Sequence, residues 1–223
     1  MTIRHLSLRS RCVALLALIG LVAGCESTYY SAWEKVGVYK RDLLVDRVED
    51  AQEAQEEAKE EFATALEHFS SVVNVGPSEL KDTYEKLNDS FEDAEERAEE
   101  VSERIDEVED VSDDLFSEWR KELDQISNTN LRSASARQLK ASEAKYADLI
   151  RAMRRAESRM DPVLTAFRDN VLFLKHNLNA QAIASLKTEL NSIEANVGTL
   201  IREMEASIAE SQEFIREMEL IEG

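Results

Sequence analysis

The chain is poor in the residues that reverse a backbone and in those that cross-link it. Its 223 residues include only six glycines, two prolines and two cysteines. With so few turn-forming residues the chain has few places to change direction, which predicts long helices. A disulfide is not expected. Cys12 lies in an N-terminal apolar run that has the features of a cleaved signal, and its removal would leave Cys25 as the one cysteine. Stability must therefore come from apolar packing.

Basic residues are also scarce relative to acidic ones. The whole chain has 46 acidic and 27 basic residues, and the part from Cys25 onward keeps 24 of the basic ones, giving it a net charge of −22. Such a surface repels phosphate backbones and anionic headgroups, which disfavours nucleic-acid binding. Solubility is the favoured explanation of this acidity, and a cationic partner is the other.

The first 24 residues have the organisation of a secretory signal. Three arginines precede an apolar run over 12–23, which is too short to cross about 30 Å of hydrocarbon. The run ends in small residues followed by Gly24-Cys25, and this arrangement resembles the lipobox of bacterial lipoproteins. The resemblance implies cleavage between Gly24 and Cys25 and lipidation of the Cys25 sulfur.

These features predict three parts and a location. Residues 1–24 are the signal peptide, 25–41 the anchor with a juxtamembrane segment, and 42–223 a helical domain. The lipid on Cys25 would hold the protein at the periplasmic face of the cell envelope, and the outer membrane is the favoured site. Glu26 follows the cysteine where the inner-membrane retention signal of enteric bacteria has Asp, which leaves the sorting open.

Aromatic residues gather directly after the anchor. Tyr29, Tyr30, Trp33 and Tyr39 lie within this short segment. Amphipathic aromatic rings favour the membrane interface, so they are candidates for a collar at headgroup level. A plug that closes one end of the helical domain is an equally good interpretation.

The remaining sequence predicts an all-α fold, an elongated antiparallel up-down helical bundle of coiled-coil type. Apolar residues recur at alternating steps of three and four over four segments, which is the pattern of helices that share a core. One seven-residue gap falls at Gln55, and Pro162 predicts a kink inside the third segment. A three-helix arrangement with a long, kinked last helix stays open, because neither glycine nor proline marks residues 177–179. The predicted segments are 31–75, 78–127, 131–178 and 180–221.

Charge is divided unequally between the two middle segments. Residues 78–127 carry 20 acidic and 6 basic side chains, whereas residues 131–178 carry 10 basic and 5 acidic ones. An antiparallel turn near residue 129 would lay an arginine cluster beside the acidic segment. Intramolecular counter-charge is the favoured role of the cluster, and a docking site is the alternative. The arginines are Arg151, Arg154, Arg155 and Arg159, with Glu96, Glu99, Glu103 and Glu107 as expected neighbours.

No catalytic constellation stands out. His68 and His176 are far apart and lack the Glu-x-x-His spacing of metal-binding bundles. Glycine-rich phosphate loops and Ser/His/Asp patterns do not occur. The sequence therefore predicts a protein that is not an enzyme and needs neither cofactor nor metal.

Two stretches, residues 29–51 and 171–180, resemble a family of uncharacterised bacterial lipoproteins with a coiled-coil domain of unknown function. The resemblance implies lipidation and an all-helical fold, and it brings no activity. We expect a structural or protein-interaction role in the envelope, with an unknown protein partner, and homo-oligomers stay open. The alternative is a periplasmic carrier that holds a lipid or small molecule in a cavity between helices.

Overall fold

A computed structural model describes residues 40–76 and 78–220, without the side chains of 219 and 220. This part of the chain contains four long α-helices and no strand. It confirms the all-α class, and the separate third and fourth helices show that the three-helix alternative is wrong. Cys25 and the aromatic residues Tyr29, Tyr30, Trp33 and Tyr39 lie outside the described residues. The helices are α3 (Lys40–Val72), α4 (Leu80–Leu123), α5 (Thr129–His176) and α6 (Ala180–Leu220).

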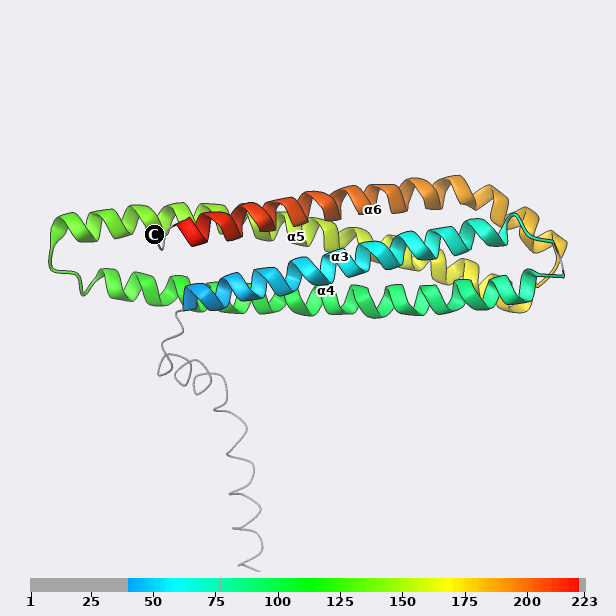
Figure 1. Cartoon of the computed structure of the whole chain (residues 1–223), viewed down its shortest axis with the longest axis horizontal. Coiled ribbons are helices and arrows are strands. Elements are labelled where there is room, and N and C mark those ends of the chain that lie inside the picture. The colour runs from blue at the N-terminus through cyan, green and yellow to red at the C-terminus, as the bar shows by residue number, and fades with distance from the viewer. Residues whose placement is uncertain (1–39, 77, 221–223) are drawn as a thin grey trace, which may run out of the picture. The chain divides into compact units, whose positions relative to one another are not determined.

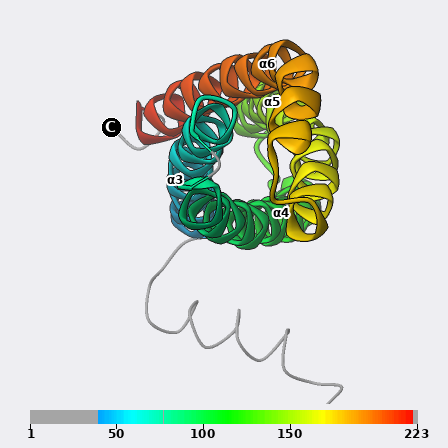
Figure 2. The same ribbon diagram turned by 90° about the vertical axis from the view of Figure 1, so that its right-hand side faces the viewer.

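The chain from Leu43 onward forms one compact unit, an up-down bundle. Consecutive helices run antiparallel along it (Figure 1). Seen end-on, the helices stand at the corners of a square, so that α3 neighbours α4 and α6 and lies diagonally from α5 (Figure 2). Ion pairs join adjacent helices, such as Arg97 Nη1 with Glu57 Oε2 at 2.8 Å between α4 and α3. The α4–α5 hairpin extends beyond the ends of the other two helices (Figure 1).

The core follows the predicted heptad positions. Phe69 of α3 and Phe167 of α5 meet across the diagonal with ring centroids 6.2 Å apart. Apolar burial of this kind is the main stabilising contribution to the fold, because the described residues contain no disulfide. The largest fully buried side chains are Phe62, Phe69, Phe167, Leu44, Leu80, Leu87, Ile105, Leu149, Met153, Leu174, Leu186 and Leu200.

Several of the apolar heptad positions that should face the core (the seam) are not fully buried. Leu178 is exposed, and the half-buried ones are Tyr84, Leu115, Trp119, Ile126, Tyr146, Leu190 and Ile215. Leu178 is 41% exposed, because it lies in the turn after α5 instead of continuing that helix. Near the end of α6 the inward positions are Phe214 and Met218, while Ile215 is half-buried. The gap at Gln55 is not a break in the seam, since this side chain is fully buried.

Asparagines explain the turns that glycine and proline do not mark. Asn128 caps α5, its Oδ1 accepting from the backbone N–H of Asn130 at 3.0 Å and of Leu131 at 3.2 Å. Asn179 Oδ1 accepts from Ala182 N at 3.1 Å and starts α6 in the same way. Pro162 lies inside α5, which continues through it. As expected, no reversal occurs at this proline, and the kink stays a prediction.

None of the four described helices combines the length and the apolar content that crossing a membrane requires.

Candidate functional site

A cleft of about 520 Å³ lies between α4 and α5, close to Pro162. Its floor is apolar and consists of the buried side chains of Ala98, Met160 and Leu164. Ala98 is the small residue at an inward position of α4, and it leaves room that a leucine would fill. The small side chain of Ala98 therefore contributes to the space of the cleft.

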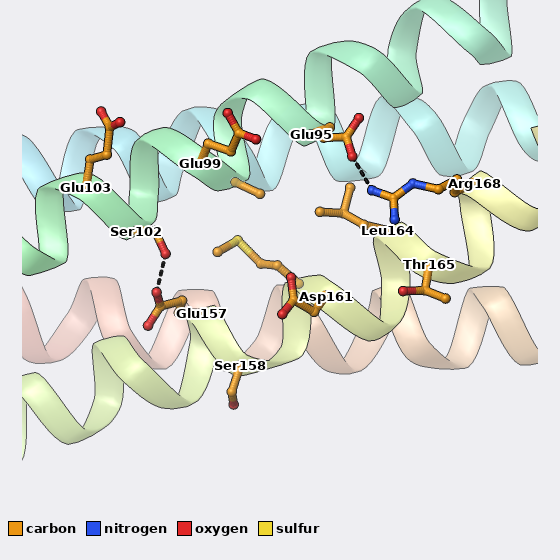
Figure 3. Close-up of a pocket in the computed structure, with 12 residues that line it drawn as sticks. Glu95, Glu99, Ser102, Glu103, Glu157, Ser158, Asp161, Leu164, Thr165 and Arg168 are labelled. Atoms are coloured by element: carbon orange, nitrogen blue, oxygen red, sulfur yellow. Dashed lines mark hydrogen bonds and ion pairs between the residues drawn. The ribbon is translucent and has the colours of Figure 1, made fainter.

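Two polar contacts bridge the helices at the ends of the cleft (Figure 3). At one end the Ser102 hydroxyl donates to the carboxylate of Glu157. At the other end the Arg168 guanidinium donates to Glu95, and it also lies 5.8 Å from the centroid of the Phe91 ring. Both contacts join α4 to α5.

The rim of the cleft is acidic. Glu99 and Glu103 line it from α4, with their carboxylates directed away from α5 in this view, and Asp161 lines it from α5 (Figure 3). Among the residues that the structure describes, none donates a hydrogen bond or forms an ion pair with these three carboxylates. An apolar floor below unpaired carboxylates suits a cation at the end of an aliphatic chain, because the chain covers the floor while the charge meets the rim.

The arginine cluster does not face α4 as a unit. Arg154 alone reaches across, with Nη2 at 2.5 Å from Asp106 Oδ1 and 2.5 Å from Glu109 Oε2. It also binds Glu157 on its own helix at 2.9 Å. Its hydrogen bond to Glu109 is the largest of the effects that raise the pKa of Arg154 above its ordinary value. Arg154 is therefore paired within the chain, but its partners on α4 are Asp106 and Glu109 and not the expected Glu96, Glu99, Glu103 or Glu107.

The other three arginines correct the expected pairing with Glu99, Glu103 and Glu107. Arg151 pairs with Asp148 of its own helix at 2.8 Å, and Arg155 lies 3.8 Å from Glu203 of α6. Arg159 is exposed, and no described residue pairs with it. The reason is helical geometry: each residue turns the side chain by about 100°, so neighbours of Arg154 point to other faces.

The two histidines have structural surroundings. His68 is half-buried, and its Nδ1 lies 2.5 Å from Ser90 Oγ, which also donates to the carbonyl of Lys86 at 3.0 Å. His176 is exposed in the last turn of α5, the end of a helix at which the helix dipole favours basic residues. Within the described ranges no group of three or more His, Cys, Asp or Glu side chains is arranged to hold a metal ion.

Sequence reasoning allowed for a cavity between helices beside small residues such as Ala98, but it did not place the cleft between α4 and α5 or identify its polar lining. Glu157, Asp161 and Arg168 were not singled out, although they continue the helix face of α5 that carries Arg154. The usable signal was the alanine at position 98 beside a line of carboxylates on the same helix. It could not show which side of α5 would lie opposite, because that depends on the register of the two helices.

Residues 29–218 match the model of a family described as a protein of unknown function, DUF2959. No curated protein matches the chain. The family description gives no activity, so the function must be argued from the residues. Because the match covers most of its length, the chain belongs to the DUF2959 family.

Proposed function

We propose that this protein is a lipid-anchored component of the bacterial cell envelope that acts by binding another protein and not by catalysis. The lipobox-like sequence ending at Cys25 supports the anchor, and the long helical bundle supports a structural or binding role. On this proposal the lipid holds the bundle at the periplasmic face, with the outer membrane as the favoured site.

The observation that carries the binding role is the acidic rim of the α4–α5 cleft. Glu99, Glu103 and Asp161 keep their charges unpaired within the described part of the chain, next to an apolar floor. Solubility would explain exposed carboxylates, but it would not explain why these three line an apolar cleft. The arrangement favours a partner segment that inserts a lysine or arginine, with its aliphatic stem on Met160 and Leu164.

The role is tested by replacing Glu99 with a photo-crosslinking amino acid in intact cells. A matched control places the same amino acid at Glu205, an exposed acidic position on α6. We expect one protein to be captured from position 99 and not from position 205. Adding Glu103→Lys should abolish the capture, because a second cation at the rim repels the basic segment. Equal capture at both positions would contradict a specific docking site.

The anchor is tested separately by Cys25→Ser. The substituted protein should leave the membrane fraction or keep its signal peptide, since the sulfur that accepts the lipid is gone. A lipid anchor depends on burial of alkyl chains, at about 0.8 kcal/mol per CH₂. A variant that is processed and still fully bound to cleared membranes would exclude Cys25 as the anchor.

A further inference from the structure

A second hollow, of about 340 Å³, lies between α5 and α6. Its lining residues Phe214 and Met218 place it close to the end of α6. Its walls are largely apolar, formed by Ala141 of α5 and by Phe214 and Met218 of α6. It shares no residue with the α4–α5 cleft, so its role can be tested independently.

The hollow follows from a change in the seam. Inward positions of α6 carry serine at 207 and 211 before Phe214 and Met218. On the facing part of α5, the residues are Ala141 and Ser142. Two large side chains therefore meet two small ones, and the space between them is not filled.

Among the polar residues that line this space, which include Gln138, Lys145 and Glu217, Ser142 is the buried one. Its side chain is buried, and its Oγ has no hydrogen-bond partner among the described residues. A serine in a helix can satisfy itself by bonding the carbonyl four residues earlier, yet here it does not. A buried hydroxyl without a partner is unfavourable. Rotation about its Cα–Cβ bond can turn Oγ toward the hollow, where a ligand oxygen would satisfy it.

The mouth of the hollow carries one positive and one negative group. Lys145 Nζ lies 2.8 Å from Glu217 Oε1, and both side chains are partly exposed. The hydrogen bond to Glu217, followed by the charges of Glu217, Glu213 and Glu210, raises the pKa of Lys145 above its ordinary value. An anionic headgroup alone would meet Lys145 but be repelled by Glu217. A headgroup with both signs complements the pair.

We propose that this hollow binds the single acyl chain of a zwitterionic lysophospholipid. The chain lies between Phe214 and Met218, an ester oxygen accepts from the Ser142 hydroxyl, and the headgroup spans Lys145 and Glu217. The phosphate faces the lysine and the ammonium faces the carboxylate, so each charge at the mouth keeps a partner. The site is a binding site, and no covalent step is involved.

The test uses the full-length lipidated protein in phosphatidylcholine vesicles. The probe is lysophosphatidylethanolamine with a photoactivatable diazirine in its acyl chain. After irradiation we expect crosslinks on the peptides that contain residues 141–142 and 214–218, mapped by mass spectrometry. Crosslinks that are spread over all four helices, or missing from these peptides, would overturn the proposal.

Two matched variants separate occupancy of the hollow from contact with the vesicle. Ala141→Phe fills the hollow and should reduce the crosslink yield at least about fivefold, the equivalent of about 1 kcal/mol. Ala141 and Ala144 are both exposed, but Ala144 does not line the hollow, so Ala144→Phe should leave the yield unchanged. Thermal unfolding by circular dichroism shows that both variants are folded. An unchanged yield in folded Ala141→Phe would exclude the hollow.

Polar substitutions and competitors test the ligand class and do not require an overpacked core. Ser142→Ala should weaken binding about two- to tenfold, the equivalent of one hydrogen bond. Unlabelled lysophosphatidylethanolamine should displace the probe, and palmitate at the same membrane fraction should displace it less. Equal displacement by both, with no effect of Lys145→Glu, would contradict recognition of a zwitterionic headgroup.

Discussion

The two longest helices, α4 and α5, have the same apolar pattern on the side that faces the core and opposite net charges on the side that faces solvent. Both present a heptad stripe of apolar residues to the core. The segment of α4 has 20 acidic and 6 basic side chains, whereas that of α5 has 10 basic and 5 acidic ones. Core packing therefore explains the inward-facing residues of both helices, but it does not explain why their outward-facing residues differ in charge.

Overall complementarity between the two helices does not mean that their charges pair. Arg154 and Arg168 neutralise carboxylates of α4, but Glu99 and Glu103 keep no partner among the described residues. Arg155 turns away to α6. The opposite charges of α4 and α5 are thus only partly paired with each other within the fold. The carboxylates of α4 that stay unpaired are the ones that a partner could recognise.

The largest loss of stability should come from truncating a buried side chain of the apolar seam that α4 and α5 share. Phe167→Ala on α5 removes a fully buried ring and should lower the free energy of unfolding by about 3–5 kcal/mol. Phe91→Ala on α4 should lie at the lower end of that range, because this residue is 7% exposed. Urea unfolding followed by circular dichroism measures both. An unchanged midpoint in either variant would mean that its face is not part of the core.

The fold was predictable because the seam repeats. Leu87, Val101 and Ile105 recur at heptad spacing, and each is fully buried. The exceptions have local causes. Leu178 kept the phase of α5 but lies in a turn, because Asn179 caps the next helix and ends the run. A cap formed by asparagine is a weaker sequence signal than glycine or proline, so this boundary was the least defined.

Pro162 distinguishes the two helices a second way, since α4 has no proline. A proline in a helix interior lowers the stability of the folded state by about 3 kcal/mol relative to alanine. Replacing it by alanine also raises the conformational entropy of the unfolded chain, which lowers stability by about 0.4–1 kcal/mol. Pro162→Ala should therefore stabilise the protein by about 2 kcal/mol, measured by urea unfolding. Ala166→Pro, one turn later, is the converse control and should destabilise it. A loss of stability in Pro162→Ala would show that the proline is required for the packing of α4 on α5.

Arg154 is the next test, because it is the arginine of the cluster that binds α4. Arg154→Met removes its pairs with Asp106 and Glu109 and should lower stability by about 1 kcal/mol, since the group is partly exposed. Arg151→Met is the matched control, whose partner lies on the same helix, and it should have almost no effect. Equal losses in both variants would mean that the contact across the helices adds nothing.

The candidate site was less predictable than the fold. An arginine cluster and an acidic helix could be recognised, but their pairing depends on where around α5 each side chain points. Arg154 and Arg155 are adjacent in sequence, yet one binds α4 and the other lies near α6. An error of one residue in helical phase moves a side chain by about 100°, which is enough to change its partner.

The smallest expected effect decides which partner Arg155 has. Its Nη1 lies 3.8 Å from Glu203 Oε2, and the arginine side chain is 52% exposed. A double-mutant cycle of Arg155→Glu with Glu203→Arg should give a coupling of a few tenths of a kcal/mol that shrinks with added salt. The parallel cycle with Glu103→Lys should give no coupling, because Arg155 does not lie beside Glu103. Coupling to Glu103 that exceeds coupling to Glu203 would require α5 to be rotated relative to its neighbours, and would bring the positive face of α5 onto the acidic cleft.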